Sequence, residues 1–412
     1  MKIAILGYGL EGKSVEKYFK NKAEITIFDN FTELPDTNGF DLVFRTPSVK
    51  LPEKVPKNWT SVTRYFFDHC PCEIIGVTGT KGKGTTCTMT TELLKSLGKN
   101  VYLVGNIGEP SIDHLDKLSK DDVVVYELSS FQLWDLKKSP SVAIVLRIEP
   151  DHLNVHKDFD DYVSAKANIA RHQSENDTLI YFKNNPDSKR IADTSPAKKY
   201  PYPISDKSEV LVKLLNSLPL VGEHNKENLE AALLATYSYF KTPLSLDEFL
   251  TKNYDALKSA IEKITPLPHH IEFVRKLGNV AYYDDSFCTV FPALDVALKS
   301  FGDTPLVLIA GGSSKGTDLT PAKKAIFGRK NLIKAVLIGK IAKELAKGED
   351  SEKYILADTD FEKAVKTAKE LAENTGKKAI VLLSPCAASF DMFKSYKDRG
   401  DQFKNLVNSL DE

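Results

Sequence analysis

The chain has 412 residues, which is enough for about two to four domains of ordinary size. Hydrophobic residues make up 42% of it and charged residues 27%, which is the composition of a soluble globular protein. Basic and acidic residues number 56 each, so the net charge gives no reason to expect nucleic acid or an anionic membrane as a partner.

The start of the chain and its cysteines point to the cytoplasm. The first residues lead into an apolar strand without the charged segment and long apolar run of a secretory signal. No stretch reaches the ~20 apolar residues of a membrane span. The five cysteines are odd in number, and Cys70 and Cys72 form C-x-C rather than the C-x-x-C of zinc and redox sites. We therefore expect a cytoplasmic protein with reduced thiols and no membrane contact.

The first block, residues 1–70, is predicted to be a small Rossmann-like domain. Its first strand runs into G-x-G-x-x-G from Gly7 to Gly12, and its second strand ends at Asp29. Alone, this pattern would suggest NAD, but a single glycine motif is weak evidence and the block is too short for a full dinucleotide fold. The strands are expected at residues 2–6, 24–28 and 41–44.

The second and third blocks, residues 71–265 and 266–412, are each predicted to be a parallel sheet covered by helices. The prolines of segment 265–268 make a plausible linker between them. Helices are expected at residues 86–97 and 224–240. The second block's strands are expected at 73–77, 101–104, 123–127 and 142–148, and the third block's at 280–283, 306–310, 334–338 and 379–383. The fold class is therefore α/β, with three domains.

A glycine- and lysine-rich loop at residues 78–86 is the strongest single signal. A buried strand runs into it and a helix leaves it, as in loops that hold phosphates with backbone N–H groups and a helix N-terminus. Its spacing differs from G-x-x-x-x-G-K-[ST], because Gly84 follows Lys83. Lys83 is predicted to reach the β- and γ-phosphates of ATP, and Thr85 to bind Mg²⁺.

The loop T-G-T-x-G-K resembles that of the Mur ligases and folylpolyglutamate synthases. Further segments resemble the D-glutamate-adding branch of the Mur ligase family, in the family's order and over most of the chain. ELSSFQL at 127–133 and SPCAASFD at 384–391 are the most specific of them. The others are GNIG at 105–108, EPDHL at 149–153, AKANI at 165–169, GEHN at 222–225, LPHH at 267–270 and GGSSKG at 311–316.

The resemblance implies a two-step reaction. ATP phosphorylates the carboxylate of UDP-N-acetylmuramoyl-L-alanine, and the amine of D-glutamate then displaces phosphate, in cytoplasmic peptidoglycan precursor synthesis by a monomer. It implies an Mg²⁺ site and a Lys166 converted by CO₂ into a carbamate that binds metal. By helical spacing alone Lys166 would be solvated, and His152 alone would be an ordinary core or surface histidine. The implied catalytic residues are Lys83, Glu127, His152, Lys166 and His269, and the implied metal ligands are Thr85, Glu127, His152 and Lys166.

The resemblance also assigns contacts to the two nucleotides and the amino acid. Asn225 and Asn228 share a helix face, although Asn225 could instead be an N-cap. His156 has no support from the family segments and is expected to be solvated. ATP contacts are expected from Gly79, Thr80, Lys81, Gly82, Lys83, Gly84, Thr85, Thr86, Asn225, Asn228, His270 and Asp285. Substrate contacts are expected from Leu10, Glu11, Asp29, Asn30, Thr46, Asn106, Ser129, Gln132, Thr289, Lys315, Ser389, Phe390 and Tyr396.

Four positions depart from the family pattern, and one of them is Val290, which stands where the family has an asparagine. Phe287 stands where the family has a lysine, and a neutral aromatic ring cannot pair with a carboxylate. His270 stands where the family has an arginine, so a pH-dependent cation replaces a permanent one. Lys81 replaces an asparagine in the phosphate loop. These changes leave open a Mur-like ligase for another amino acid, such as a folylpolyglutamate synthase, and a non-catalytic homologue that binds ATP or the UDP precursor.

Overall fold

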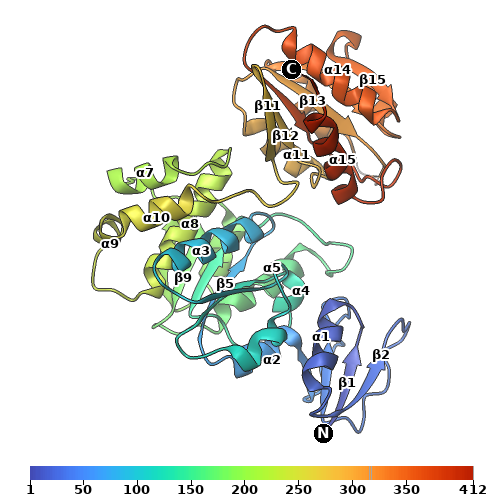
Figure 1. Cartoon of the computed structure of the whole chain (residues 1–412). Coiled ribbons are helices and arrows are strands. Elements are labelled where there is room, and N and C mark those ends of the chain that lie inside the picture. Colours follow the sequence, from blue (N-terminus) through green and yellow to red (C-terminus); the bar gives the residue numbers. More distant parts are fainter. Residues whose placement is uncertain (315, 317, 412) are drawn as a thin grey trace. The chain divides into compact units, whose positions relative to one another are not determined.

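The computed structural model describes residues 1–314, 316 and 318–411, and these residues build three separate sheets (Figure 1). They divide into two compact units, residues 1–219 with 225–264, and residues 220–224 with 265–412. None of the helices in the described part of the chain combines the length and apolarity that a membrane crossing requires.

The first sheet has four parallel strands in the order β2-β1-β3-β4. In the central strand β1, Ile3 and Ile5 pack on one face against Phe19, while Ala4 and Leu6 pack on the other against Trp59. This period of two buries both faces of the strand, as parallel sheets require. The elements are β1 (Lys2–Leu6), α1 (Leu10–Phe19), β2 (Glu24–Phe28), β3 (Leu42–Arg45), β4 (Trp59–Ser61) and α2 (Val62–His69).

The second sheet has six parallel strands in the order β10-β9-β8-β5-β7-β6, with helices on both faces (Figure 1). One face packs on α5 and α6, and the other on α3 and α8. Its strands are β5 (Glu73–Thr78), β6 (Val101–Gly105), β7 (Val123–Glu127), β8 (Val142–Val145), β9 (Thr178–Phe182) and β10 (Lys198–Tyr202). Its helices are α3 (Lys83–Ser96), the 3-10 helix Ser111–Lys117, α4 (Ser130–Leu133), α5 (Phe159–Arg171), α6 (Pro186–Ala192), α7 (Glu209–Asn216), α8 (Glu223–Tyr239), α9 (Leu246–Lys252) and α10 (Tyr254–Ile261).

The third sheet also has six strands, in the order β11-β12-β16-β13-β14-β15, and only β11 is antiparallel to its neighbour. Helices α11, α12 and α13 cover one face, and α14 and α15 cover the other. Its strands are β11 (Glu272–Leu277), β12 (Val280–Asp284), β13 (Leu306–Gly311), β14 (Leu332–Ile338), β15 (Tyr354–Asp358) and β16 (Ala379–Leu383). Its helices are α11 (Phe291–Lys299), α12 (Thr320–Phe327), α13 (Ala342–Ala346), the 3-10 helix Ser351–Lys353, α14 (Phe361–Glu373) and α15 (Tyr396–Asn408).

The predicted α/β class with three mainly parallel sheets is confirmed. Each sheet lies within one of the predicted blocks, whose boundaries stay a prediction. The strand expected at 142–148 is too long, because β8 ends at Val145 and the next residues turn toward the phosphate loop, where Arg147 O accepts from Thr80 N. The helix expected from residue 86 begins earlier, at Lys83, directly after the left-handed Gly82.

Candidate active site

The loop after β5 requires glycine at two positions, because the backbone there has positive φ and neighbouring atoms leave no room for a side chain. Gly79 and Gly82 have φ of 156° and 84°, a region that side chains rarely adopt. A Cβ on Gly79 would lie 2.6 Å from Leu146 Cβ, and one on Gly82 would lie 2.8 Å from the Asn228 Oδ1 atom. The loop is therefore packed tightly against the end of β8 and against helix α8, and its backbone N–H groups stay close to the N-terminus of α3.

Hydrogen bonds tie this loop to the carboxyl ends of the neighbouring strands. Thr78 Oγ1 donates to Leu128 O over 2.9 Å, just after β7. Thr80 Oγ1 lies 2.9 Å from Glu149 O and 3.0 Å from the Tyr162 hydroxyl of α5. These hydrogen bonds hold the loop against the neighbouring strands and α5, and the sequence pattern did not predict the contacts of Thr78 and Tyr162.

Two lysine amines meet inside this loop. Lys83 Nζ donates to Gly79 O over 3.1 Å and to Thr80 O over 3.0 Å. Lys166 Nζ, from α5, donates to Gly79 O over 2.9 Å and to Thr78 Oγ1 over 3.3 Å. Lys166 is only 2% exposed, so the view of it as a solvated lysine is wrong.

The electrostatics of the two amines follow from this burial. Desolvation lowers the pKa of Lys83, and the opposing effect of Glu127 is smaller. Desolvation lowers the pKa of Lys166 well below its usual value, and the charge of Lys83 adds to the effect. Neutral carbonyl oxygens balance an ammonium charge only weakly, so the loop favours a bound anion.

Glu127 provides the nearby negative charge. It is the last residue of β7, is 5% exposed, and accepts from Asn106 Nδ2 over 2.9 Å. Asn106 follows β6, and its backbone N–H donates to Glu127 O. Predicted residues from neighbouring strands therefore meet at one edge of the sheet, as ligands of parallel α/β sheets do.

The segment before α5 contains one half-exposed histidine, His152, and one buried histidine, His156. His152 has a left-handed φ of 55°, is half exposed, and lies edge-on to the Phe131 ring at 5.1 Å. Burial lowers its pKa, and Asp151 opposes this. The expectation that His156 is solvated is wrong. It is 3% exposed and bonded to Ser130 Oγ at 2.9 Å and to Asp161 at 3.0 Å, which anchors the segment on α4.

The predicted nucleotide residues of α8 lie on one helix face. Asn228 is 8% exposed and packs against Gly82. The alternative that Asn225 caps this helix is wrong, because α8 begins at Glu223. Of the remaining loop residues, Lys81 is exposed and Thr86 is buried with its hydroxyl on Gly82 O.

The first sheet presents its predicted residues around the turn after β1. Thr46 Oγ1 donates to Leu6 O over 3.0 Å, and a Cβ on Gly7 would collide with that hydroxyl at 2.3 Å. Asp29 accepts from the Tyr8 N–H over 3.1 Å, and Asn30 has a left-handed φ of 54°. Leu10 is 70% exposed.

Glu11 joins this turn to the segment after β7. Gln132 Nε2 donates to Glu11 Oε1 over 3.0 Å, and Ser129 and Gln132 form the capping box of α4. Glu11 Oε2 is buried without a hydrogen-bond partner in the described structure. Burial raises the pKa of Glu11 to about 7, although Gln132 and Arg45 oppose the rise. Arg45 is 1% exposed and forms an ion pair with Asp135 at 2.7 Å.

Replacing Glu11 with glutamine is expected to stabilise the protein above neutral pH. The folded-state pKa lies above the unfolded value, so the folded chain holds an extra proton between pH ~4.5 and ~7 and loses stability as pH rises through that window. The variant lacks this loss, and at pH 8 it should be more stable by up to about 3 kcal/mol. Urea unfolding from pH 5 to 8 measures it. The exposed Glu33→Gln is the control, and equal pH slopes for Glu11→Gln and the parent would contradict the prediction.

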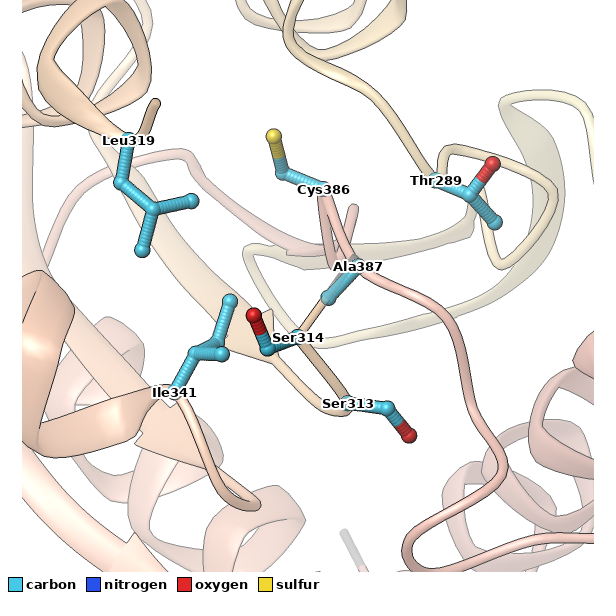
Figure 2. A pocket seen from close by; sticks show the side chains of 7 residues that line it. All are labelled: Thr289, Ser313, Ser314, Leu319, Ile341, Cys386 and Ala387. Carbon is cyan, nitrogen blue, oxygen red and sulfur yellow. The ribbon is translucent and has the colours of Figure 1, made fainter. Parts of the chain in front are cut away.

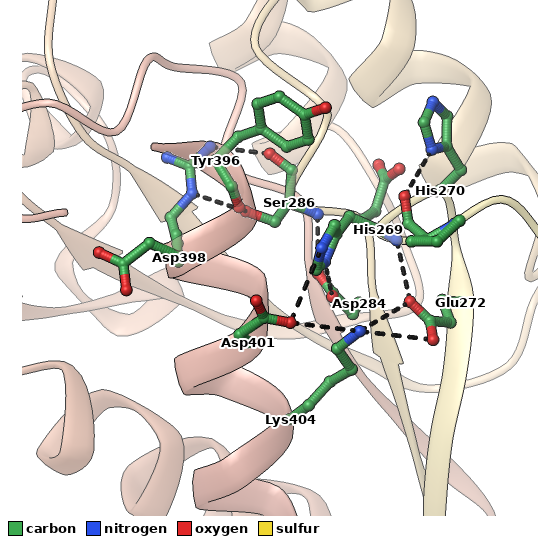
Figure 3. A network of polar contacts seen from close by, with 12 residues as sticks. His269, His270, Glu272, Asp284, Ser286, Tyr396, Asp398, Asp401 and Lys404 are labelled. Atoms are coloured by element: carbon green, nitrogen blue, oxygen red, sulfur yellow. Dashed lines mark hydrogen bonds and ion pairs between the residues drawn. The ribbon is translucent and has the colours of Figure 1, made fainter. Parts of the chain in front are cut away.

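His269 lies in the loop before β11 and is buried beside the third sheet. It is 4% exposed, and its Nδ1 lies 2.7 Å from the fully buried Asp284, while its backbone N–H donates to Glu272 (Figure 3). His269, Glu272 and Asp284 are the one group of three clustered metal-ligand side chains among the described residues. Lys404 Nζ lies 3.2 Å from Glu272, so the lysine ammonium group already balances the charge of this carboxylate. His269 thus fixes the loop before β11.

Asp285 is the buried acid next to this network. It accepts from Ser384 Oγ over 2.7 Å and from Ile271 N over 3.3 Å. Burial raises its pKa to about 8. A protonated carboxyl group at this position can donate a hydrogen bond, which a sequence pattern does not reveal.

The two aromatic departures from the family pattern contact each other. The His270 and Phe287 rings are stacked, with centroids 4.1 Å apart and planes at 26°. Tyr396 lies edge-on to Phe287 at 5.1 Å, and His270 Nδ1 lies 2.8 Å from Pro268 O. The stack and the contact with Pro268 O hold the His270 ring in a defined orientation.

A small cavity of about 10 Å³, the room of one water molecule, lies in the same unit as this stack (Figure 2). Thr289 is the one predicted substrate residue among the side chains that line it, and Ser313, Ser314 and Cys386 were not predicted. Ser389 is 2% exposed and Phe390 is 75% exposed. Lys315 lies outside the described residues.

Comparisons with known proteins fit this geometry. The Mur ligase middle domain model matches residues 77–236, which contain the loop, Glu127, His152 and Lys166. A folylpolyglutamate synthase from Mycobacterium tuberculosis, solved with ADP, matches at TM-score 0.61 and 14% identity over 83% of this chain and 93% of that one. The UDP-N-acetylmuramate–alanine ligase of Thermotoga maritima matches at TM-score 0.61 and 16% identity over 99% of both chains. The fold is that of the Mur-type ligases, and the part of the chain that holds the phosphate loop matches their middle domain.

The particular branch follows from the curated relatives. The UDP-N-acetylmuramoylalanine–D-glutamate ligase of Acetivibrio thermocellus is 32% identical over 100% of this chain and 97% of its own length. That of Clostridium tetani is 31% identical over 99% and 97%. The chain belongs to the UDP-N-acetylmuramoylalanine–D-glutamate ligase family. The predicted resemblance is confirmed, and the dehydrogenase alternative from the N-terminal glycines is wrong.

Proposed function

We propose that this chain joins D-glutamate to UDP-N-acetylmuramoyl-L-alanine and converts ATP to ADP and phosphate, as a monomer in the cytoplasm. The observation that supports it best is the meeting of Lys83 and Lys166 at Gly79 O, with Glu127 beside them. This arrangement is suited to a polyphosphate, and it lies in the part of the chain that the Mur ligase model matches.

In the first step a carboxylate oxygen attacks the γ-phosphorus and ADP leaves. The loop N–H groups and the N-terminus of α3 hold the phosphate oxygens, and Lys83 turns from its carbonyl partners to the negative charge. Because those carbonyls are weak partners for an ammonium group, this turn costs little. In the second step the D-glutamate amine attacks the acyl carbon and phosphate leaves.

The residues present fit Mg²⁺. Glu127 offers a buried carboxylate at a strand end, Thr85 a hydroxyl at the start of α3, and His152 a half-exposed imidazole. A bound Mg²⁺ would neutralise phosphate charge. Asn106 orients the Glu127 carboxylate through its hydrogen bond.

Lys166 fits the proposed carbamate. Carbamate formation needs a neutral amine, whose nitrogen attacks CO₂ and then loses a proton. Burial and the charge of Lys83 lower the pKa of Lys166 and so favour that neutral form. The product is an oxygen ligand with a negative charge, which would offset the charge of Lys83.

The first and third sheets would bind the other substrates. The turn at Gly7, with Thr46, Asp29 and Asn30, is proposed to hold the UDP group. Asp285, Thr289, Lys315, Ser389, Phe390 and Tyr396 are proposed for the ribose of ATP and for D-glutamate.

Replacing Phe287 with alanine is expected to raise KM for ATP by about two- to twelve-fold with kcat nearly unchanged. An aromatic pair contributes about 0.5–1.5 kcal/mol, and its loss frees the His270 ring proposed to contact ATP phosphate. Steady-state kinetics with varied ATP measure the effects on KM and on kcat separately. Phe273→Ala removes another exposed phenylalanine of the same unit and should leave both constants unchanged. A fall in kcat alone would contradict the positioning role.

Phosphate release tests the function. The purified protein is mixed with ATP, Mg²⁺, UDP-N-acetylmuramoyl-L-alanine and one amino acid at a time. Release that requires D-glutamate supports the proposal, and release only with another amino acid would keep the ligase and change its specificity. Binding of ATP and the UDP precursor without release would instead favour the non-catalytic alternative.

A further inference from the structure

Cys70 and Cys72 form a pair of thiols outside the proposed active site. Cys70 is the C-cap of α2, and Cys72 directly precedes β5. Their Sγ atoms lie 3.5 Å apart, and both residues are half-buried against the core of the central sheet. The other three cysteines, Cys87, Cys288 and Cys386, are buried.

The distance between the sulfurs makes a bond accessible. A disulfide has an S–S length of about 2.05 Å, so the two atoms must approach by roughly 1.5 Å. Side-chain rotation supplies such a movement without unfolding the segment, because both residues are partly exposed and the intervening Pro71 is exposed. We propose that Cys70 and Cys72 form a reversible internal disulfide by exchange with a low-molecular-weight disulfide.

The two thiols differ in reactivity. The contact between the two sulfurs lowers the pKa of Cys70 and raises the pKa of Cys72. The thiolate is the nucleophile in thiol–disulfide exchange, so Cys70 attacks first and Cys72 resolves.

The exchange balances in two steps. The Cys70 thiolate attacks one sulfur of the external disulfide, whose S–S bond breaks and releases one thiolate. The Cys72 thiol then loses its proton and attacks Cys70 Sγ, which breaks the mixed disulfide and releases the second thiolate. The protein loses two electrons, and the two protons end on the two released thiols.

The product should be easily reduced again. Only one residue, Pro71, separates the cysteines, and its ring fixes the backbone between them, so the closed disulfide ring is strained. Strained disulfides have higher reduction potentials and are the labile ones. The bond would stiffen the connection between α2 and the strand that leads into the phosphate loop.

Oxidised glutathione and the full-length protein test this. Intact mass should fall by two hydrogen atoms, peptide mapping should join Cys70 to Cys72, and dithiothreitol should restore the starting mass. Cys72→Ser should stop at one glutathione on Cys70, whereas Cys70→Ser should react more slowly, at Cys72. Cys87→Ser, which changes a buried thiol, should still form the disulfide, and circular dichroism checks that all variants fold. A stable glutathione adduct on the parent, or a disulfide that joins other cysteines, would overturn the proposal.

Discussion

Replacing Lys83 with methionine is expected to lower kcat/KM for ATP by at least about 10²- to 10³-fold, the usual effect of removing one transition-state charge partner. Among the described residues, Lys83 Nζ donates to the carbonyl oxygens of Gly79 and Thr80, and burial lowers its pKa. It therefore gains its full electrostatic partner only when phosphate is present, and that gain is greatest as charge develops on the transferred group.

Lys81→Met is the matched control, since Lys81 is an exposed lysine of the same loop. It should change kcat/KM by much less than Lys83→Met. Nucleotide-dependent phosphate release measures both variants. A Lys83→Met enzyme within ten-fold of the parent would contradict the role of this amine in phosphoryl transfer.

Replacing Lys166 with methionine is expected to abolish ligation. It is also expected to stabilise the folded chain at pH values below the usual lysine pKa of 10.5. The first effect follows from the proposed carbamate, whose loss leaves the metal with one ligand fewer and removes the negative charge that would offset Lys83. The activity loss should reach about 10²-fold or more, the upper range for metal-site changes. Product formation with saturating substrates measures it.

The stability effect has a definite sign. The folded-state pKa of Lys166 lies well below 10.5, so the unfolded chain binds more protons between the two values, and stability of the parent rises with pH across that window. The methionine variant lacks this rise. Urea unfolding across a pH series without CO₂ compares the free energy of unfolding of the parent and of Lys166→Met. The exposed Lys157→Met is the control and should show the parent's change of stability with pH. A parallel slope for Lys166→Met would contradict the buried neutral amine.

The ¹³C signal of a carbamate provides an independent readout. Parent protein equilibrated with ¹³C-labelled bicarbonate should show one carbamate resonance that Lys157→Met keeps and Lys166→Met loses. Loss of activity without a carbamate signal in the parent would leave Lys166 as a simple amine ligand and contradict the modification.

The sequence predicted the parts of the fold that local patterns determine. Strands β1, β2, β7 and β16 have their predicted ends, since each is an apolar run bounded by polar or turn residues. The antiparallel β11 was missed, because half of its residues are charged and no apolar alternation marks it as a strand, and its position depends on pairing with β12.

The site was predicted as a set of residues but not as an arrangement. The loop glycines and Lys83 were predicted correctly as a phosphate loop, because their spacing reflects the backbone conformation that such a loop requires. The burial of Lys166 and His156 comes from packing of α5 and α4 against the sheet, which no local pattern contains. The contact between His270 and Phe287 joins two segments that the sequence treats as separate departures.

Isotope transfer tests the ligase reaction most directly. UDP-N-acetylmuramoyl-L-alanine with ¹⁸O in both carboxylate oxygens is incubated with ATP, Mg²⁺, D-glutamate and the protein, and the released phosphate is analysed by mass spectrometry. If ATP activates the carboxylate, each phosphate carries one ¹⁸O atom and the amide product keeps the other. Unlabelled phosphate would mean that water attacks ATP, which would contradict ligation through an acyl phosphate.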